Sequence, residues 1–493
     1  MDYILYLPLF LIIFPLAGAM VTGIAKEEND RLRNTLAVIV SLISAGAMIL
    51  LLHYYIQGGG WELLIHQIAP GLEIKLRVDP LAALFGGTAA ILWSFAVIYS
   101  TGYMAHEHNR RRYFIFYLLS LGMTMGIALS ANLLTLYIFY EFLTIFTYPL
   151  VVHEGNEEAK KAGIKYIIYS FFGAGLILIG LIITYGNLGT LEFARGGIVD
   201  LSTGSLLMWQ ATFICFILGF GVKAAVMPLH SWLPSAMAAP TPVSALLHAV
   251  AVVKSGVFGI LRSMYSIFGI TALVGLQMGY FVAALVSVTI LVASIIAMQQ
   301  DVLKKRLAYS TISQLGYITL GAGLMSTIGL AGGLLHIINH ALLKITLFFC
   351  AGAIITVTGK KKISELNGLG KRMPLTMIAF TLAAIGMIGI PPVNGFISKW
   401  YLIQGSLENG AWFFVVILIG SALLNAAYFL PIIIGAFFKE GDFTPVKGAE
   451  APLSMLIPIL ILIAGCLVVG TNLQLTVPYI ENIADYLFYS GGK

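Results

Sequence analysis

The chain has 493 residues, of which 59% are apolar and only 10% are charged, and its mean hydropathy is +0.94. Soluble domains carry about 25% charged residues, so this composition excludes an ordinary soluble protein and indicates a protein of the lipid bilayer. The net charge of +6 does not indicate nucleic-acid binding, because the basic residues fall in short loops without an aromatic patch that would stack bases.

Apolar runs recur along the whole chain, so residues 1–493 are predicted to form one all-α, polytopic membrane domain. A bilayer core needs about 20 apolar residues per helix. About fourteen spans are predicted, near residues 3–24, 35–55, 82–103, 113–130, 132–152, 164–185, 207–228, 242–261, 273–298, 308–325, 330–357, 374–407, 411–438 and 453–471. The first run follows Asp2 rather than a basic segment and is too long for a signal peptide, so it is predicted to remain as a helix.

The distribution of Lys and Arg over the loops predicts the orientation. Nineteen of these residues fall in one alternate set of loops and five in the other, where Arg262 is counted. Because basic loops stay in the cytoplasm, the richer side is predicted to be cytoplasmic in a cell inner (plasma) membrane, with both termini outside.

Cofactor chemistry is not indicated. The three cysteines, Cys215, Cys350 and Cys466, lie in apolar runs without a CxxC pair, so no iron–sulfur, zinc or disulfide chemistry is predicted. Phosphate-loop and nucleophile-elbow motifs are also missing from the sequence. The chain is therefore not expected to be catalytic alone, and its energy is expected to come from an ion gradient or a partner subunit.

Charged residues inside the spans are the main functional signal. The four remaining basic residues are Lys223, Lys254, Lys344 and Lys399, and Glu141 lies at the centre of an apolar run. A lysine at the centre of a transmembrane helix costs about 2.5–3.5 kcal/mol, so these residues are predicted to face a wet or paired interior. This pattern favours movement of protons or other cations.

Each of these charges also has a structural interpretation. Lys223 and Lys399 lie near span ends and are open to snorkelling toward an interface, whereas Lys254 and Lys344 are central. Glu141 is open to a structural ion pair with a lysine. A pair that breaks and re-forms would equally serve a proton relay, and Glu141 is expected to lie within direct or one-water reach of Lys223.

Histidines extend this set. His336, His340 and Lys344 are spaced four residues apart, which places them on one helix face. A metal site formed by His336 and His340 lacks a third ligand and is disfavoured. His230 and His248 are as well explained as satisfied core histidines as they are as relay members.

Two spans contain helix breakers. The first break runs from Gly219 past Lys223 through several prolines, and the second surrounds Pro391 and Pro392 before Lys399. Irregular backbone at membrane depth is tolerated where it lines a cavity, and broken helices point to a transporter's ion path. Lys399 follows Lys223 by 176 residues, and the same offset carries Glu141 to Tyr317, so a repeat of about five helices is predicted.

The stretch around the first break resembles a known family. Val222-Lys223-Ala224 through Pro228-Leu229-His230-Ser231-Trp232-Leu233-Pro234, followed by Ala239-Pro240-Thr241-Pro242 through His248, is similar to the signature of antiporter-like subunits. This family includes Mrp cation/proton antiporters, the pumping subunits of respiratory complex I (NADH:ubiquinone oxidoreductase) and related membrane-bound hydrogenase subunits. The resemblance covers nearly the whole chain.

The resemblance implies roles for individual residues. Glu141 matches the family's helix 5 glutamate, Lys223 and Lys254 its helix 7 and helix 8 lysines, and Lys399 the terminal residue of broken helix 12. Lys344, His336 and His340 match the helix 11 group. The family fold implies two inverted five-helix repeats, here residues 113–261 and 273–438, within a complex of other membrane subunits surrounded by lipid.

The subtype that the chain resembles most is the Mrp D-type subunit or its hydrogenase-like equivalent. Lys399, where the M-type subunit of complex I has a glutamate, carries this assignment. A redox-driven pumping subunit of a complex I-like or hydrogenase-like assembly is the first alternative, and exchange of Na⁺ stays open. A stand-alone transporter of an organic solute or a purely structural subunit fits less well, because the buried charges spread over at least five spans.

Overall fold

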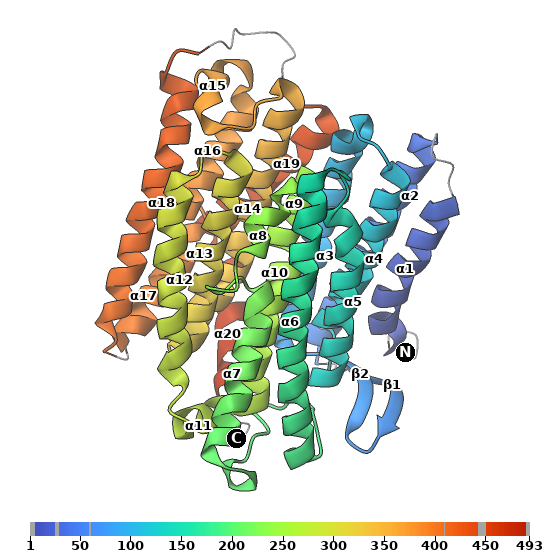
Figure 1. Cartoon of the computed structure of the whole chain (residues 1–493), viewed down its shortest axis with the longest axis vertical. Helices are drawn as coiled ribbons and strands as arrows, with labels where there is room; N and C mark the ends of the chain where they lie inside the picture. Colours follow the sequence, from blue (N-terminus) through green and yellow to red (C-terminus); the bar gives the residue numbers. More distant parts are fainter. Residues whose placement is uncertain (1–4, 25–28, 59–60, 409, 442–449, 490–493) are drawn as a thin grey trace.

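The computed structural model describes residues 5–24, 29–58, 61–408, 410–441 and 450–489. Its long helices run roughly parallel to one another and form a single bundle (Figure 1). The helices up to the middle of the chain are α1 (Leu7–Ile24), α2 (Asp30–Ile56), α3 (Pro80–Tyr103), α4 (Arg110–Ala128), α5 (Leu133–Val151), α6 (Glu157–Leu188), α7 (Leu206–Lys223), α8 (Trp232–Ser235), α9 (Thr241–Ala249) and α10 (Val252–Leu261). The later helices are α11 (Gly269–Gly275), α12 (Gly279–Gln299), α13 (Leu303–Gly323), α14 (Thr327–Thr358), α15 (Leu369–Arg372), α16 (Pro374–Ile388), α17 (Gly395–Glu408), α18 (Trp412–Phe438), α19 (Leu453–Thr471) and α20 (Val477–Phe488).

Membrane-spanning character follows from length and hydropathy. Within the described ranges, 11 helical stretches are long and apolar enough to cross a membrane, which makes the chain a polytopic membrane protein. Every predicted span coincides with a helix or a broken pair of helices. Some of these helices are too short or too polar to be counted among the 11. The count of about fourteen spans therefore stays a prediction.

Polar side chains fix where many of the helices begin. Asp79 accepts a hydrogen bond from the Ala82 amide at 2.8 Å at the start of α3, and Asn132 does the same for Thr135 at 2.8 Å at the start of α5. These caps satisfy amide groups that have no partner in the first turn of a helix. Side-chain caps of this kind define the N-termini of α2, α3, α5, α6, α7 and α14.

A two-stranded antiparallel hairpin lies at one end of the bundle, outside the helical layers (Figure 1). It consists of β1 (Trp61–Ala69) and β2 (Leu72–Val78) and lies between the spans predicted at 35–55 and 82–103. Lys75 on β2 forms ion pairs with Glu62 at 3.0 Å and with Glu192 at 3.4 Å. The hairpin is thereby tied to the loop that follows α6.

Helix α14 occupies the centre of the bundle. It packs against helices from both halves of the chain, including α3, α9, α13, α16 and α17. Nearly all residues from Gly329 to Ile354 are buried, so the polar residues on this helix are enclosed by protein.

Three basic residues that the sequence analysis placed in loops are instead buried in helical segments. Arg262 is 1% exposed and belongs to a π-helical segment, η5 (Arg262–Phe268), that continues α10. Arg33 and Arg306 are buried in α2 and α13. The loop assignment of these residues was wrong, because each has an ion-pair or hydrogen-bond partner that lets it enter the bundle: Asp79 for Arg262, Asp30 for Arg33 and the Tyr428 carbonyl for Arg306. Lys26, Lys447, Lys493 and the two chain ends lie outside the described residues.

Candidate functional site

The first predicted break is present at the end of α7. Helix α7 ends at Lys223, and the next helical turn begins only at Trp232. Ala225 has φ +55°, a left-handed conformation that a continuing helix does not allow. The Trp232 indole donates to the Val222 carbonyl at 2.7 Å, so this side chain satisfies one of the carbonyls that the break exposes.

The second predicted break separates α16 from α17. Gly389 has φ +97° and ends α16, and α17 begins at Gly395. The Lys399 ammonium donates to the carbonyls of Met387 at 2.7 Å and Ile388 at 2.9 Å. These carbonyls belong to the last turn of a helix, where they lack amide partners and carry partial negative charge. Lys399 therefore caps the broken end of α16 from inside the bundle.

The expected direct contact between Glu141 and Lys223 is absent from the described residues. The Lys223 ammonium instead donates to the Tyr140 carbonyl at 2.6 Å and lies 3.3 Å from the centre of the Tyr140 ring. Glu141 Oε1 is buried without a hydrogen-bond partner. The backbone and ring of Tyr140 take the place of a direct contact with the carboxylate, and the two charges still act on each other. Approach of Glu141 to Lys223 through one water stays a prediction.

Along α14, the predicted stripe is present. The His336 and His340 rings lie 6.0 Å apart. His336 is held from both sides, by Ser398 Oγ at 2.8 Å and by Gln314 Oε1 at 2.9 Å. Lys344 donates to Ser310 and to the Leu307 carbonyl. One face of α14 therefore presents titratable groups to α13 and α17.

Two members of the predicted set are buried without partners. Among the described residues, neither ring nitrogen of His340 has a hydrogen-bond partner, and the Lys254 ammonium has no acceptor. Lys254 lies on α10. Val250 and Ala251, just before it, form a further interruption, which separates α9 from α10. The charge of Lys254 acts on His336 and on His340, so α10 and α14 bring these groups into one electrostatic neighbourhood.

Neutral side chains that the sequence analysis passed over bridge this neighbourhood to Lys399. With its amide oxygen turned toward the donors, Asn425 on α18 accepts from Lys399 at 3.2 Å and from Gln314 at 2.9 Å. Gln314 in turn contacts His336. The Lys399 ammonium also lies 5.1 Å from the centre of the Tyr317 ring. Tyr317 is the residue that the 176-residue offset aligns with Glu141. Gln314 and Asn425 could have been found in the sequence, because each is a polar residue inside an otherwise apolar predicted span.

The two remaining histidines differ in their surroundings. His248 is fully buried on α9, both of its ring nitrogens lack partners within the described chain, and its ring packs 4.8 Å from that of Phe348. His230 is half-buried in the first break, and its ring lies 6.2 Å from that of Tyr309. The charge of Lys344 acts on His248, whereas no contact within the described part of the chain connects His230 to the group on α14.

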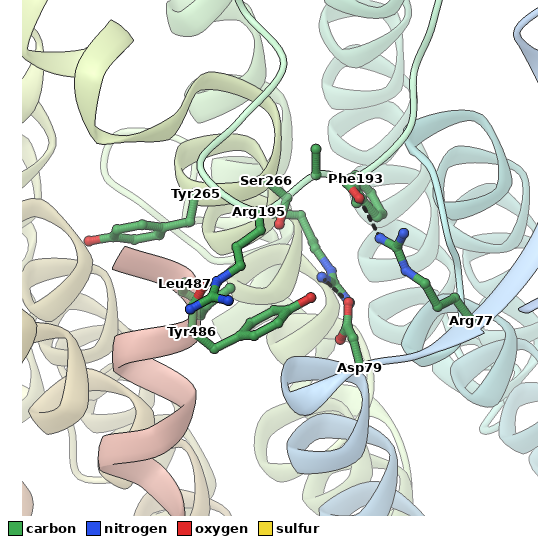
Figure 2. A pocket seen from close by; sticks show the side chains of 10 residues that line it. Arg77, Asp79, Phe193, Arg195, Tyr265, Ser266, Tyr486 and Leu487 are labelled. Carbon is green, nitrogen blue, oxygen red and sulfur yellow. Dashed lines mark hydrogen bonds and ion pairs between the residues drawn. The ribbon is translucent and has the colours of Figure 1, made fainter. Parts of the chain in front are cut away.

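A second buried cluster of charges lies where α3, η5 and α20 meet (Figure 2). Arg262 forms a bidentate ion pair with Asp79 at 2.6 and 2.8 Å, and both side chains are almost fully buried. Arg195 stacks on the Tyr486 ring at 5.1 Å. Figure 2 shows Arg77 donating to the Phe193 carbonyl and Arg195 lying beside the Tyr486 ring. Arg262, Arg77 and Arg195 each have a partner in this cluster. We therefore interpret the cluster as structural, linking α3, η5 and α20.

One group has a metal-ligand composition. Donor atoms of Glu107, His108 and Glu154 lie within 4.8 Å of one another, in the connections after α3 and α5. This group is unrelated to His336 and His340, the pair that the sequence analysis tested as a metal site. Glu107 and Glu154 also act electrostatically on Lys304, whose ammonium form competes with a cation for these carboxylates.

Comparison with known proteins gives the family. Residues 130–424 match the transmembrane family model described as NADH:quinone oxidoreductase/Mrp antiporter, and residues 69–114 match the N-terminus of chain 5 of complex I. The chain belongs to the NADH:quinone oxidoreductase/Mrp antiporter family.

Relatives of this antiporter family chain come from several kinds of complex. It is 34% identical over 510 aligned positions to NADH-quinone oxidoreductase subunit N of Desulforudis audaxviator, covering 98% of both chains. A chain of an archaeal membrane-bound sulfane sulfur reductase is similar in structure, with a TM-score of 0.90, 26% identity and 98% coverage of both chains. A chain of the Mrp complex from Dietzia sp. superposes with a TM-score of 0.88 at 23% identity, covering 99% of this chain and 98% of that one. The family resemblance is confirmed, and the D-type subtype stays a prediction.

Proposed function

We propose that this antiporter family chain translocates protons as one subunit of a multisubunit membrane complex. The proposal is supported by the proton-binding groups that the bundle encloses wholly or in part: Glu141, Lys223, Lys254, His340, His336, Lys344 and Lys399. We propose that these groups form one file that passes protons. Amines and imidazoles both bind and release protons. Groups of this kind are too costly in a membrane interior to be retained as packing.

The geometry supports two different kinds of site along this file. Lys223 and Lys399 are hydrogen-bonded to backbone carbonyls at or beside the breaks, so loss of a proton from either amine weakens a contact with the broken backbone. Lys254 and His340 lack such partners and are suited to pass a proton onward through transient water. We infer that protonation is linked to the broken backbone at Lys223 and Lys399, whereas Lys254 and His340 have no such link.

The relatives indicate which kind of partners this chain has. The similar chains belong to an NADH-quinone oxidoreductase, a respiratory sulfur reductase complex and an Mrp complex. We infer that this chain works with other membrane subunits in a plasma membrane, with its Lys/Arg-rich side in the cytoplasm and both termini outside. The inverted repeats 113–261 and 273–438 would supply one half-channel each.

A second candidate is a redox-driven pump rather than a cation/proton antiporter. The match to subunit N over 98% of both chains favours it. The two candidates differ in what drives proton movement, and the relay within this chain is the same in both.

Vesicles that contain the whole purified complex test the proposal. A pH-sensitive dye inside the vesicles should report acidification or alkalinisation when either a Na⁺ gradient or an electron donor and quinone are supplied. A response to the Na⁺ gradient identifies an antiporter, and a response to the donor identifies a redox pump. A complex that moves no protons under either condition would contradict the proposal.

A further inference from the structure

A hollow on the side of the bundle lies beside the first break. It has a volume of about 400 Å³, and its wall includes Lys161 and Lys165 of α6, Lys305 of α13 and Ser231, which follows the break. A second hollow of about 240 Å³ is lined by residues of α6 alone and shares the two α6 lysines. We call the two hollows together the α6 hollow, because they share one wall.

The α6 hollow carries more positive than negative charge. Among the described residues, Lys161, Lys165 and Lys305 form no ion pair, whereas the adjacent Lys160 forms one at 2.8 Å. Glu158 is the one acidic side chain in the described wall, so three ammonium groups face a single carboxylate. An anionic group therefore binds here more favourably than a neutral one.

The same face of α6 becomes apolar beyond the lysines. Lys161, Lys165, Ile168 and Phe172 follow one another at intervals of four, three and four residues, which places them along one stripe of the helix. Ile168 is 61% exposed and Phe172 is 55% exposed, so this part of the stripe has no cover within the chain. A molecule that fits the whole stripe has an anionic group at one end and an apolar tail.

The lysines lie near the ends of their helices. Helix α6 is long and apolar enough to cross a membrane, and Lys161 and Lys165 lie within its first three turns. Lys305 lies in the first turn of α13. All three are among the basic residues on the side that is predicted to be cytoplasmic. Basic pockets between transmembrane helices on that side bind anionic lipid headgroups.

We propose that the α6 hollow binds an anionic phospholipid. The headgroup phosphate lies among Lys161, Lys165 and Lys305, and an acyl chain lies along the apolar stripe of α6. A soluble phosphate would engage the lysines only and would leave the stripe uncovered. The Tyr169 and Ser231 hydroxyls in the wall are hydrogen-bonded to each other at 2.8 Å, so the bound lipid also contacts the segment that follows the first break.

A photoreactive lipid tests where the lipid binds. The purified whole complex in detergent is illuminated with phosphatidylglycerol that carries a diazirine in one acyl chain, and the adducts are mapped by mass spectrometry. Adducts are expected on residues 164–172 of α6, displaced by unlabelled phosphatidylglycerol but not by phosphatidylcholine or inorganic phosphate. Equal displacement by phosphatidylcholine would show unselective lipid contact, and displacement by inorganic phosphate would show a soluble-anion site. Either result, or no adduct on α6, would overturn the proposal.

Glutamine variants test the three lysines. A lysine near the membrane surface contributes about five-fold to the binding of anionic lipid. Labelling at subsaturating lipid should therefore fall by about 100-fold when Lys161, Lys165 and Lys305 are all replaced by Gln. The matched control replaces three exposed lysines outside the hollow, Lys160, Lys360 and Lys371, by Gln and should be labelled like the wild type. Equal labelling of the two triple variants would overturn the proposal.

Single variants decide the matter if the triple variant does not assemble. Lys165→Gln should lose about five-fold in labelling, and Lys165→Arg, which keeps the charge, should retain the wild-type level. Equal labelling of these two variants would contradict the role of the charge. Carboxyl-to-amine cross-linking of the hollow's lysines to another subunit would show that an acidic protein segment fills the hollow, which would also overturn the proposal. No readout measures proton movement, so the proposed function is tested separately.

Discussion

Buried charges in this bundle are held in three ways. Arg262 is paired with Asp79, Lys399 is hydrogen-bonded to backbone carbonyls, and Lys254 has no partner among the described residues. The sequence predicted that Lys254 and Lys399 lie inside the bundle, because each interrupts an apolar run. It did not predict Arg262, because a charge at the end of a span looks like a loop residue unless its partner, far away in sequence, is known.

Removal of one member of the buried ion pair should be strongly destabilising. Asp79→Ala leaves the Arg262 charge buried without its partner, which costs about 3–5 kcal/mol. The double variant Asp79→Leu with Arg262→Leu removes both charges and should be close to the wild type. Thermal unfolding of the purified complex in detergent measures this difference. An equal loss of thermal stability in the single and the double variant would contradict this prediction, because it would show that an unpaired Arg262 charge is not the cause of the loss.

The predicted spans and the two breaks marked by proline and glycine were visible in the sequence, because length, hydropathy and breaker residues act locally. Three elements were not predicted. The interruption at Val250 and Ala251 contains no breaker, so it depends on packing against other helices. The π-helical segment η5 and the hairpin β1–β2 likewise depend on distant partners, Asp79 for the former and Glu192 for the latter.

Close packing at the first break explains one of the glycines. A Cβ at Gly256 on α10 would lie 2.3 Å from the Ala224 amide nitrogen and 2.7 Å from the Phe220 carbonyl. Gly256→Ala should therefore push α10 away from the end of α7, at a cost of about 1–3 kcal/mol, and should slow translocation by displacing Lys254. Gly175→Ala on α6, where a Cβ meets nothing within 4 Å, is the control. Equal stability and equal translocation rates in both variants would refute the close contact.

The hairpin gives a pH-dependent prediction. Partial burial raises the pKa of Glu62, but hydrogen bonds and charges from Lys75 and Arg77 outweigh this effect, so the pKa is lowered overall. Its stabilising contribution is therefore complete above the unfolded-state pKa of about 4.3 and is lost as the pH falls through the lower folded-state value. For this half-exposed pair the contribution is at most about 1 kcal/mol.

The difference in melting temperature between the wild type and Glu62→Gln measures this contribution. It should be present at pH 7 and should vanish in strong acid. A difference that is the same at both pH values would show that the ion pairs do not stabilise the hairpin.

Across the whole molecule, the proposed relay joins two regions that are distant in sequence. Lys223 lies at the break after α7, Lys399 lies at the break before α17, and the central helix α14 stands between the halves that they belong to. The family resemblance predicted this arrangement at the level of the fold. The neutral bridge through Gln314 and Asn425 was not predictable, because one sequence does not show which face of a span a single polar residue occupies.

The central claim is that the lysines at the two breaks carry protons rather than hold the bundle together. Proton translocation by vesicles containing the whole complex tests it most directly, with Lys223→Ala, Lys399→Ala and, as a control, the exposed Lys160→Ala. Assembly of each complex is confirmed first. The account predicts a loss of at least about 100-fold in the first two variants and a wild-type rate in the control. Wild-type translocation by both Lys223→Ala and Lys399→Ala would contradict the relay.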